Sequence, residues 1–270
     1  MVIKEGISKN EEGKYVFDYT QDLNTDILHL CKDESGVRET ENLSYFCAYR
    51  FNEDADPLEV KTFRKLFKHN YNDPTYFYED SVFDFIESGM FYMDRYKKLS
   101  SFDIVFMTDY SNGETDGVMS VLDSLLLEYT GGTFMDVKLV KATYDSIKFD
   151  REKAKEALLA TDRYSFEEDA ERAVKNIERT FYNMKRRGEL FKIKRFLPVK
   201  GRVGFYDFLE FDTEEHKRIF QSLETGSEAL ICDDFITSGS TVKEIQRYLR
   251  SINPNVNLTV FVLIDQLRNY

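Results

Sequence analysis

Residues 229–241 of the chain read Ala-Leu-Ile-Cys-Asp-Asp-Phe-Ile-Thr-Ser-Gly-Ser-Thr. Four apolar residues lead to a pair of acids, and two more apolar residues precede a run of hydroxyl side chains around one glycine. A pattern typical of an amphipathic helix follows directly, from Val242 to Ile252. The segment therefore predicts a buried strand, a polar turn and a helix. Asp233 and Asp234 are expected at the carboxyl edge of a sheet, where open α/β folds bind ligands.

The polar turn has the chemistry needed to hold a phosphate group without a lysine. Its free backbone N–H groups, its hydroxyls and the positive end of a helix dipole all favour a dianion. The carboxylates of Asp233 and Asp234 suit ribose hydroxyls as hydrogen-bond acceptors, and they lie near enough to influence a bound divalent cation. A ribose with a 5′-phosphate has both features. The simpler alternative is a strand, turn and helix with a Ser or Thr N-cap, but a cap needs only one hydroxyl.

This segment resembles the phosphoribosyl-pyrophosphate (PRPP) binding motif of the type I phosphoribosyltransferases along all 13 positions. In that family the two acids contact the ribose 2′- and 3′-hydroxyls, and the loop after them binds the 5′-phosphate. The resemblance gives the first role to Asp233 and Asp234. It gives the second role to the residues of the turn: Thr237, Ser238, Gly239, Ser240 and Thr241. Ser238 stands where a second threonine is common and keeps the hydroxyl.

From Ser101 onward, strand patterns alternate with helix patterns, which favours an α/β fold with a parallel sheet. The resemblance implies a type I phosphoribosyltransferase core over residues 101–270, with a helical insertion at about 145–202 where the family has its flexible loop. Residues 1–100 would then form an N-terminal α+β hood, an accessory region above the base. Its Tyr- and Phe-rich stretch 71–96 either stacks on a nucleobase or simply packs in the core.

Several helix boundaries can be predicted from local signals. Asp56-Pro57 is typical of an N-cap followed by proline at the first helical position. Gly131 is expected to end a buried helix that begins near Val118. The spacing of Ser165 and Glu168 predicts a capping box at the start of a helix within the insertion.

The family's first core strand ends in a loop that binds pyrophosphate through backbone amides and a coordinated metal. The corresponding segment here follows the apolar strand 102–107 and comprises Thr108, Asp109, Tyr110, Ser111, Asn112 and Gly113. The resemblance is one of position, because these residue types are not diagnostic. Asp109 either binds Mg²⁺ through water or makes the Asx bond of a plain turn.

The end of the insertion is rich in cations, with only Glu189 against them. The basic residues are Lys185, Arg186, Arg187, Lys192, Lys194, Arg195, Lys200 and Arg202. One interpretation is an electrostatic clamp on a departing pyrophosphate. The alternatives are a solvated basic surface or a contact between subunits.

Composition limits the other possibilities. The chain has 270 residues and a net charge of −12, which disfavours nucleic acid as a partner. Its three cysteines form no CxxC pair and its three histidines are scattered, so no structural zinc site is expected. We also expect Cys232 to be an inert packing residue. Residues 1–8 lack the apolar region of a secretory signal, and no stretch is long enough for a membrane helix, so we expect a cytoplasmic protein.

The resemblance implies an enzyme of nucleotide metabolism, a glycosyltransferase that moves the 5-phosphoribosyl group from PRPP to a nucleobase or similar nitrogen acceptor and releases pyrophosphate. Mg²⁺ is the implied cofactor, held near Asp233 and Asp234 mostly through substrate and water. Asp234 is a candidate for assisting proton movement. Relatives commonly form dimers that share loop residues, which suggests a homodimer. The alternative is a catalytically reduced sensor or regulatory protein that binds PRPP or a nucleotide with the same fold.

Overall fold

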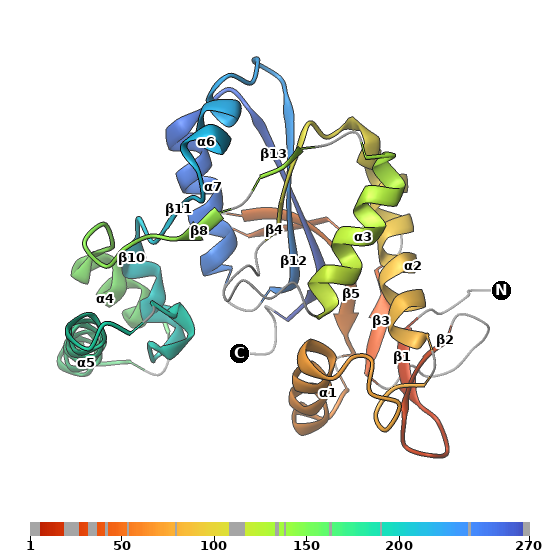
Figure 1. Ribbon diagram of the computed structural model, residues 1–270. Coiled ribbons are helices and arrows are strands. Elements are labelled where there is room, and N and C mark those ends of the chain that lie inside the picture. The colour runs from red at the N-terminus through yellow and green to blue at the C-terminus, as the bar shows by residue number, and fades with distance from the viewer. Residues whose placement is uncertain are drawn as a thin grey trace. The chain divides into compact units, whose positions relative to one another are not determined.

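The chain folds into two compact units, one of them built on a mixed β-sheet (Figure 1). The computed structural model describes residues 6–18, 27–31, 37–40, 43–52, 54–78, 80–107, 117–132, 135–137, 139–161, 164–189, 191–236 and 239–266. Unit 1 comprises Met1–Lys138, Leu223–Thr237 and Asn255–Tyr270. Unit 2 comprises Leu139–Ser222 and Ser238–Pro254.

The sheet of unit 1 has a parallel part and an antiparallel part. The parallel strands are, in spatial order, β5 (Leu43–Phe51), β13 (Asn257–Asp265), β12 (Glu228–Ile236), β6 (Ile104–Met107) and β7 (Met135–Asp136). Antiparallel strands extend the sheet beyond β5: β1 (Gly6–Lys9), β2 (Tyr15–Asp18), β3 (Leu28–Leu30) and β4 (Val37–Thr40). The prediction of an α/β fold with a parallel sheet is confirmed.

Three helices of unit 1 share one hydrophobic core with the sheet: α1 (Pro57–His69), α2 (Ser81–Tyr96) and α3 (Val118–Thr130). A short 3₁₀ helix, Leu99–Ser101, precedes β6. Helix α2 lies very close to the strands, because a Cβ on Gly89 would come within 3.2 Å of Tyr49, 3.1 Å of Ala48 and 2.9 Å of Leu263. The aromatic stretch 71–96 contributes Phe77 and Phe85 to this core.

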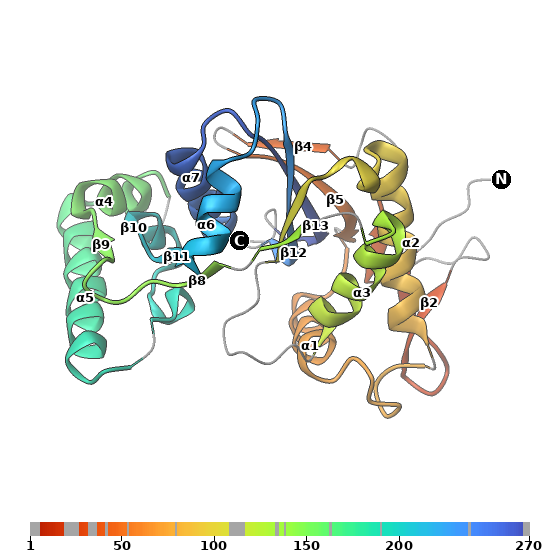
Figure 2. The same cartoon turned by 45° about the horizontal axis from the view of Figure 1, so that its top comes forward.

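Unit 2 is mainly helical and contains the insertion (Figure 2). Its helices are α4 (Arg151–Leu159), α5 (Glu167–Arg186), α6 (Glu214–Gln221) and α7 (Ser240–Ile252), with 3₁₀ helices at Ile193–Arg195 and Val199–Gly204. Two short antiparallel pairs complete it: β8 (Leu139–Lys141) with β11 (Leu209–Phe211), and β9 (Lys148–Phe149) with β10 (Phe205–Tyr206). Phe181, Phe191, Phe196 and Phe205 pack together in its largest aromatic cluster.

The units divide the chain differently from the predicted boundary at residue 100. Residues 1–100 share a sheet with β12 and β13, because β5 pairs in parallel with β13 from Phe46 to Arg50. The segment is thus part of the sheet that carries the PRPP-like motif. The predicted capping box is wrong by one position: the N-cap of α5 is Phe166, and no side chain caps it. None of the described helices is long and apolar enough to cross a membrane.

Candidate functional site

Strand β12 lies where the order of the parallel strands reverses. The chain leaves β6 toward β7 on one side and returns to β12 on the other, so β6 and β12 flank a topological switch point. Open α/β sheets bind ligands outside the carboxyl ends of the strands at such a point. The pairing of β12 with β6 ends at Cys232 and Met107, and Asp233 is the next residue. The sheet therefore brings the predicted acid pair to its carboxyl edge.

The two acids lie in different surroundings, because β12 continues through them to Ile236 and successive side chains of a strand point to opposite faces. Asp233 is half-buried, whereas Asp234 is 2% exposed. Both carboxylate oxygens of Asp234 lie 2.7 Å from the Nζ atom of Lys68 on α1. The backbone N–H of Phe235 also donates to Oδ1 of Asp234, at 2.7 Å. Of the pair, Asp233 is the acid with the greater access to a ligand.

Aromatic packing holds α1 against the end of β12. The ring centroids of Phe67 and Phe235 lie 5.7 Å apart in an edge-to-face arrangement, and Nζ of Lys68 lies 5.2 Å from the Phe235 ring. A buried carboxylate is costly without a cation and hydrogen bonds. Lys68 therefore offsets the cost of burying the Asp234 side chain, and α1 fixes the position of this part of the motif.

The helix after the motif begins without a side-chain cap. Its N-cap is Gly239, which has φ +67°, a left-handed conformation that favours glycine. Ser240 is buried and Thr241 is half-buried. The N-cap of α7 is thus Gly239 and not a Ser or Thr residue. Thr237 and Ser238 lie outside the described residues, and β12 and α7 belong to different units.

Sequence reasoning missed the cations that α1 brings to this edge. Besides Lys68, Nη1 of Arg64 donates to Oε1 of Gln266 at 2.8 Å, just beyond the end of β13. Gln266 is 5% exposed and its N–H bonds to the carbonyl of Ile236 at 3.0 Å. Lysine and arginine recurring every three or four residues along α1 was the signal that could have pointed to these contacts.

The described residues fit a directly bound metal poorly. They contain no group of three or more His, Cys, Asp or Glu side chains that could hold an ion. Both oxygens of Asp234 already face Lys68, so neither is placed as a carboxylate ligand for Mg²⁺. Cys232, next to the acids, is fully buried, and burial raises the pKa of its thiol well above the ordinary value. The thiol is thus protonated and unreactive at neutral pH.

Two other segments, 108–113 and 185–202, were predicted to bind pyrophosphate. Residues 108–113 lie outside the described residues. In the basic tract 185–202, several cations are bonded within unit 2: Lys185 pairs with Asp145 at 2.6 Å, Glu189 pairs with Arg195 and with Arg187, and Nε of Arg202 donates to the carbonyl of Phe196 at 2.8 Å.

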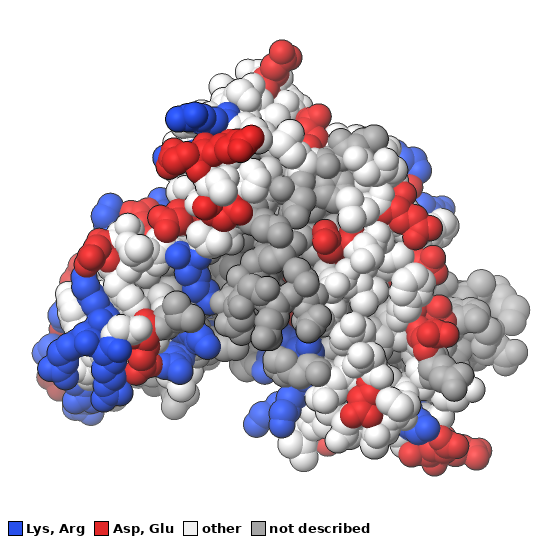
Figure 3. All heavy atoms as spheres, in the orientation of Figure 1, with Lys and Arg blue, Asp and Glu red and all other residues white. Residues whose placement is uncertain are grey.

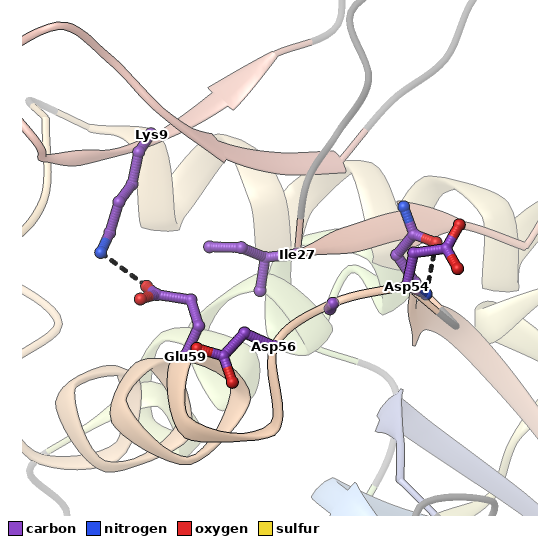
Figure 4. A pocket seen from close by; sticks show the side chains of 7 residues that line it. Lys9, Ile27, Asp54, Asp56 and Glu59 are labelled. Carbon is purple, nitrogen blue, oxygen red and sulfur yellow. Dashed lines mark hydrogen bonds and ion pairs between the residues drawn. The ribbon is translucent and has the colours of Figure 1, made fainter.

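A cavity of about 390 Å³ in unit 1 lies beside the start of α1 (Figure 4). Its lining residues are Lys9, Ile27, Asn52, Asp54, Ala55, Asp56 and Glu59. Asp56 accepts the N–H of Leu58 at 3.0 Å as the N-cap of α1, and Glu59 pairs with Lys9 at 2.6 Å. These carboxylates therefore have structural roles, and none of the residues predicted for the site lines the cavity.

Comparison with known proteins adds no relative. No model of a known protein family matches the chain, and no curated protein sequence matches it.

Proposed function

We propose that the chain binds PRPP and transfers its 5-phosphoribosyl group to a nitrogen of a nucleobase or similar acceptor, releasing pyrophosphate. The observation that carries the proposal is the motif at 229–241 on a strand that ends at a topological switch point. Gly239, in the left-handed region at the start of α7, supports a close approach of the backbone of the turn to a phosphate.

In the proposed reaction, the acceptor nitrogen attacks the anomeric carbon of the ribose while the bond from that carbon to the pyrophosphate oxygen breaks. Carboxylate oxygens of Asp233 accept hydrogen bonds from ribose hydroxyls and fix the sugar in place. Backbone N–H groups at the start of α7 hold the 5′-phosphate. Asp234, buried and paired with Lys68, holds this end of β12 in place beside Asp233.

Mg²⁺, when bound to the pyrophosphate group, would neutralise the charge of the leaving group. The geometry of Asp234 favours a metal held by substrate and water over one held by the acid pair. The residues of the chain then position the sugar and exclude water from it, and little covalent chemistry is left to them.

The test is release of pyrophosphate from PRPP in the presence of Mg²⁺ and a panel of nucleobases. We expect turnover with at least one base, and a loss of about 100-fold or more in Asp233→Asn, since a neutral amide is a weaker acceptor for the ribose hydroxyls. Asp54→Asn is the matched control: Asp54 is an exposed acid of the same unit, remote from β12 in the sequence. Equal turnover by wild type and Asp233→Asn would contradict the assignment.

A second function, a PRPP or nucleotide sensor without turnover, is favoured by one observation. Asp234 is buried against Lys68, which leaves Asp233 as the more accessible acid for the sugar. Binding of PRPP that depends on Asp233, with no pyrophosphate released for any base, would identify the sensor.

A further inference from the structure

Helix α1 has a basic face of which the proposed function uses only Lys68, as the partner of Asp234. Lys61, Arg64, Lys65 and Lys68 recur at intervals of three and four residues, so their side chains share one side of the helix. Glu59 is the single acid among the 13 residues of α1, in a chain with 49 acidic and 37 basic residues. Blue side chains gather at the lower centre of Figure 3, in the place of α1 in Figure 1.

The face has an inner and an outer pair of cations. Arg64 and Lys68 are half-buried and bond to Gln266 and Asp234 at the carboxyl ends of β13 and β12. Lys61 and Lys65 are exposed, one turn apart, and form no ion pair with a described residue. The inner pair thus ties the face to the sheet edge, and the outer pair extends the positive charge from that edge into solvent.

Helix electrostatics alone do not explain this pattern. Cations in the last turn offset the negative end of a helix dipole, and the effect is confined to that turn. Lys61 and Arg64 lie nearer the middle of α1 than its end. Surface pairing does not explain it either, because α5 balances five acids with five bases, whereas α1 has a single acid. A concentration of cations beside a ligand-binding edge is typical of sites that attract phosphorylated ligands.

We propose that the basic face of α1 (Lys61, Arg64, Lys65 and Lys68) binds the diphosphate group of a ligand seated at the carboxyl edge of unit 1. A diphosphate carries several negative charges over a short length, which matches cations spaced by one helical turn. Lys61 and Lys65 supply the accessible charge, while Arg64 and Lys68 keep the helix against β13 and β12. Where the ligand is PRPP, this deepens the proposed function; binding of pyrophosphate itself does not depend on that function.

The experiment is calorimetric titration of the full chain with inorganic pyrophosphate at low ionic strength. We expect Lys61→Glu/Lys65→Glu to weaken binding by about tenfold or more, because two attractive contacts become repulsive. The matched control is Lys175→Glu/Arg179→Glu, a pair of exposed cations one turn apart on α5 of unit 2, which produces the same change in net charge. The control is expected to bind pyrophosphate within about twofold of wild type.

The outcomes separate this proposal from the proposed function. No binding of pyrophosphate by wild type, or equal weakening in both double variants, would overturn the role of α1. Asp233→Asn should retain pyrophosphate binding while losing affinity for PRPP. If wild type and Asp233→Asn bind PRPP equally but pyrophosphate binding still depends on Lys61 and Lys65, the ribose assignment fails and the diphosphate site stands.

Discussion

Two basic segments of the chain differ in what their cations contact. The tract 185–202 is the denser of the two in sequence, yet unit 2 bonds Lys185, Arg187, Arg195 and Arg202 to its own acids and carbonyls. Helix α1 has fewer cations, but Arg64 and Lys68 contact the sheet edge that carries the acid pair. Density of charge along a sequence therefore does not predict which cations contact the sheet edge that carries the acid pair.

The largest difference between the segments should appear in stability. Lys68→Met leaves the carboxylate of Asp234 buried without its cation, and we expect a loss of about 2–3 kcal/mol, below the full cost of a broken buried pair because the Lys68 side chain is 32% exposed. Arg195→Met removes an exposed pair with Glu189 and should cost less than about 1 kcal/mol. Urea-induced unfolding measures both. Similar losses in the two variants would break the comparison.

A double-mutant cycle separates the contribution of the Lys68–Asp234 ion pair to stability from that of side-chain packing. If the loss in Lys68→Met comes from the uncompensated charge, Asp234→Asn should relieve part of it in the combined variant, so that the two single effects do not add. Additive effects would show that Lys68 acts through its contact with the Phe235 ring instead.

The second prediction concerns how the contribution of Glu59 on α1 to stability depends on pH. Burial raises the pKa of Glu59 on α1, but the ion pair with Lys9 and the hydrogen bond from Tyr15 outweigh it, and the net pKa is lowered. A lowered folded-state pKa gives stability that is present above the unfolded pKa, about 4.3, and is lost as the pH falls through the folded value. We expect Glu59→Gln to lose less stability than wild type on acidification from pH 5 to pH 3. Equal acid-induced losses in unfolding curves would refute this.

The smallest expected effect is in the tract itself. Lys192→Glu/Lys200→Glu reverses two cations of 185–202 that form no ion pair with another described residue. If α1 holds the diphosphate, pyrophosphate affinity should stay within about twofold of wild type, because charges that do not contact the ligand are screened by salt and contribute little. A tenfold loss of pyrophosphate affinity, with the α1 variants unaffected, would instead support the predicted clamp on pyrophosphate by the tract 185–202.

Local signals predicted much of the fold. Asp56 caps α1 with proline at the first turn, and Gly131 ends α3 at φ +64°. The amphipathic helix expected from Val242 to Ile252 lies within α7, Ser240–Ile252. Local signals could not predict the ion pair between Lys68 and Asp234. The two residues are 166 positions apart, and no local sequence pattern around either one indicates the other as its partner. The place of β5 beside β13 is likewise a long-range pairing, which composition and periodicity do not determine.

For the acid pair, too, local sequence predicted the approximate position in the fold but not the long-range contacts. The sequence predicted that the strand would end at Cys232, directly before Asp233 and Asp234, whereas β12 continues through both acids to Ile236 and only its pairing with β6 ends at Cys232. Their unequal burial depends on α1, which is supplied by a segment expected to be a separate accessory region.

Calorimetric titration of the full chain with PRPP and Mg²⁺ tests the central claim most directly, that the turn after β12 receives a phosphorylated ribose. The account predicts saturable binding by wild type and a loss of about tenfold or more in Asp233→Asn, with Asp54→Asn unchanged. Absence of binding by the folded wild-type chain, or equal affinity in Asp233→Asn, would contradict it.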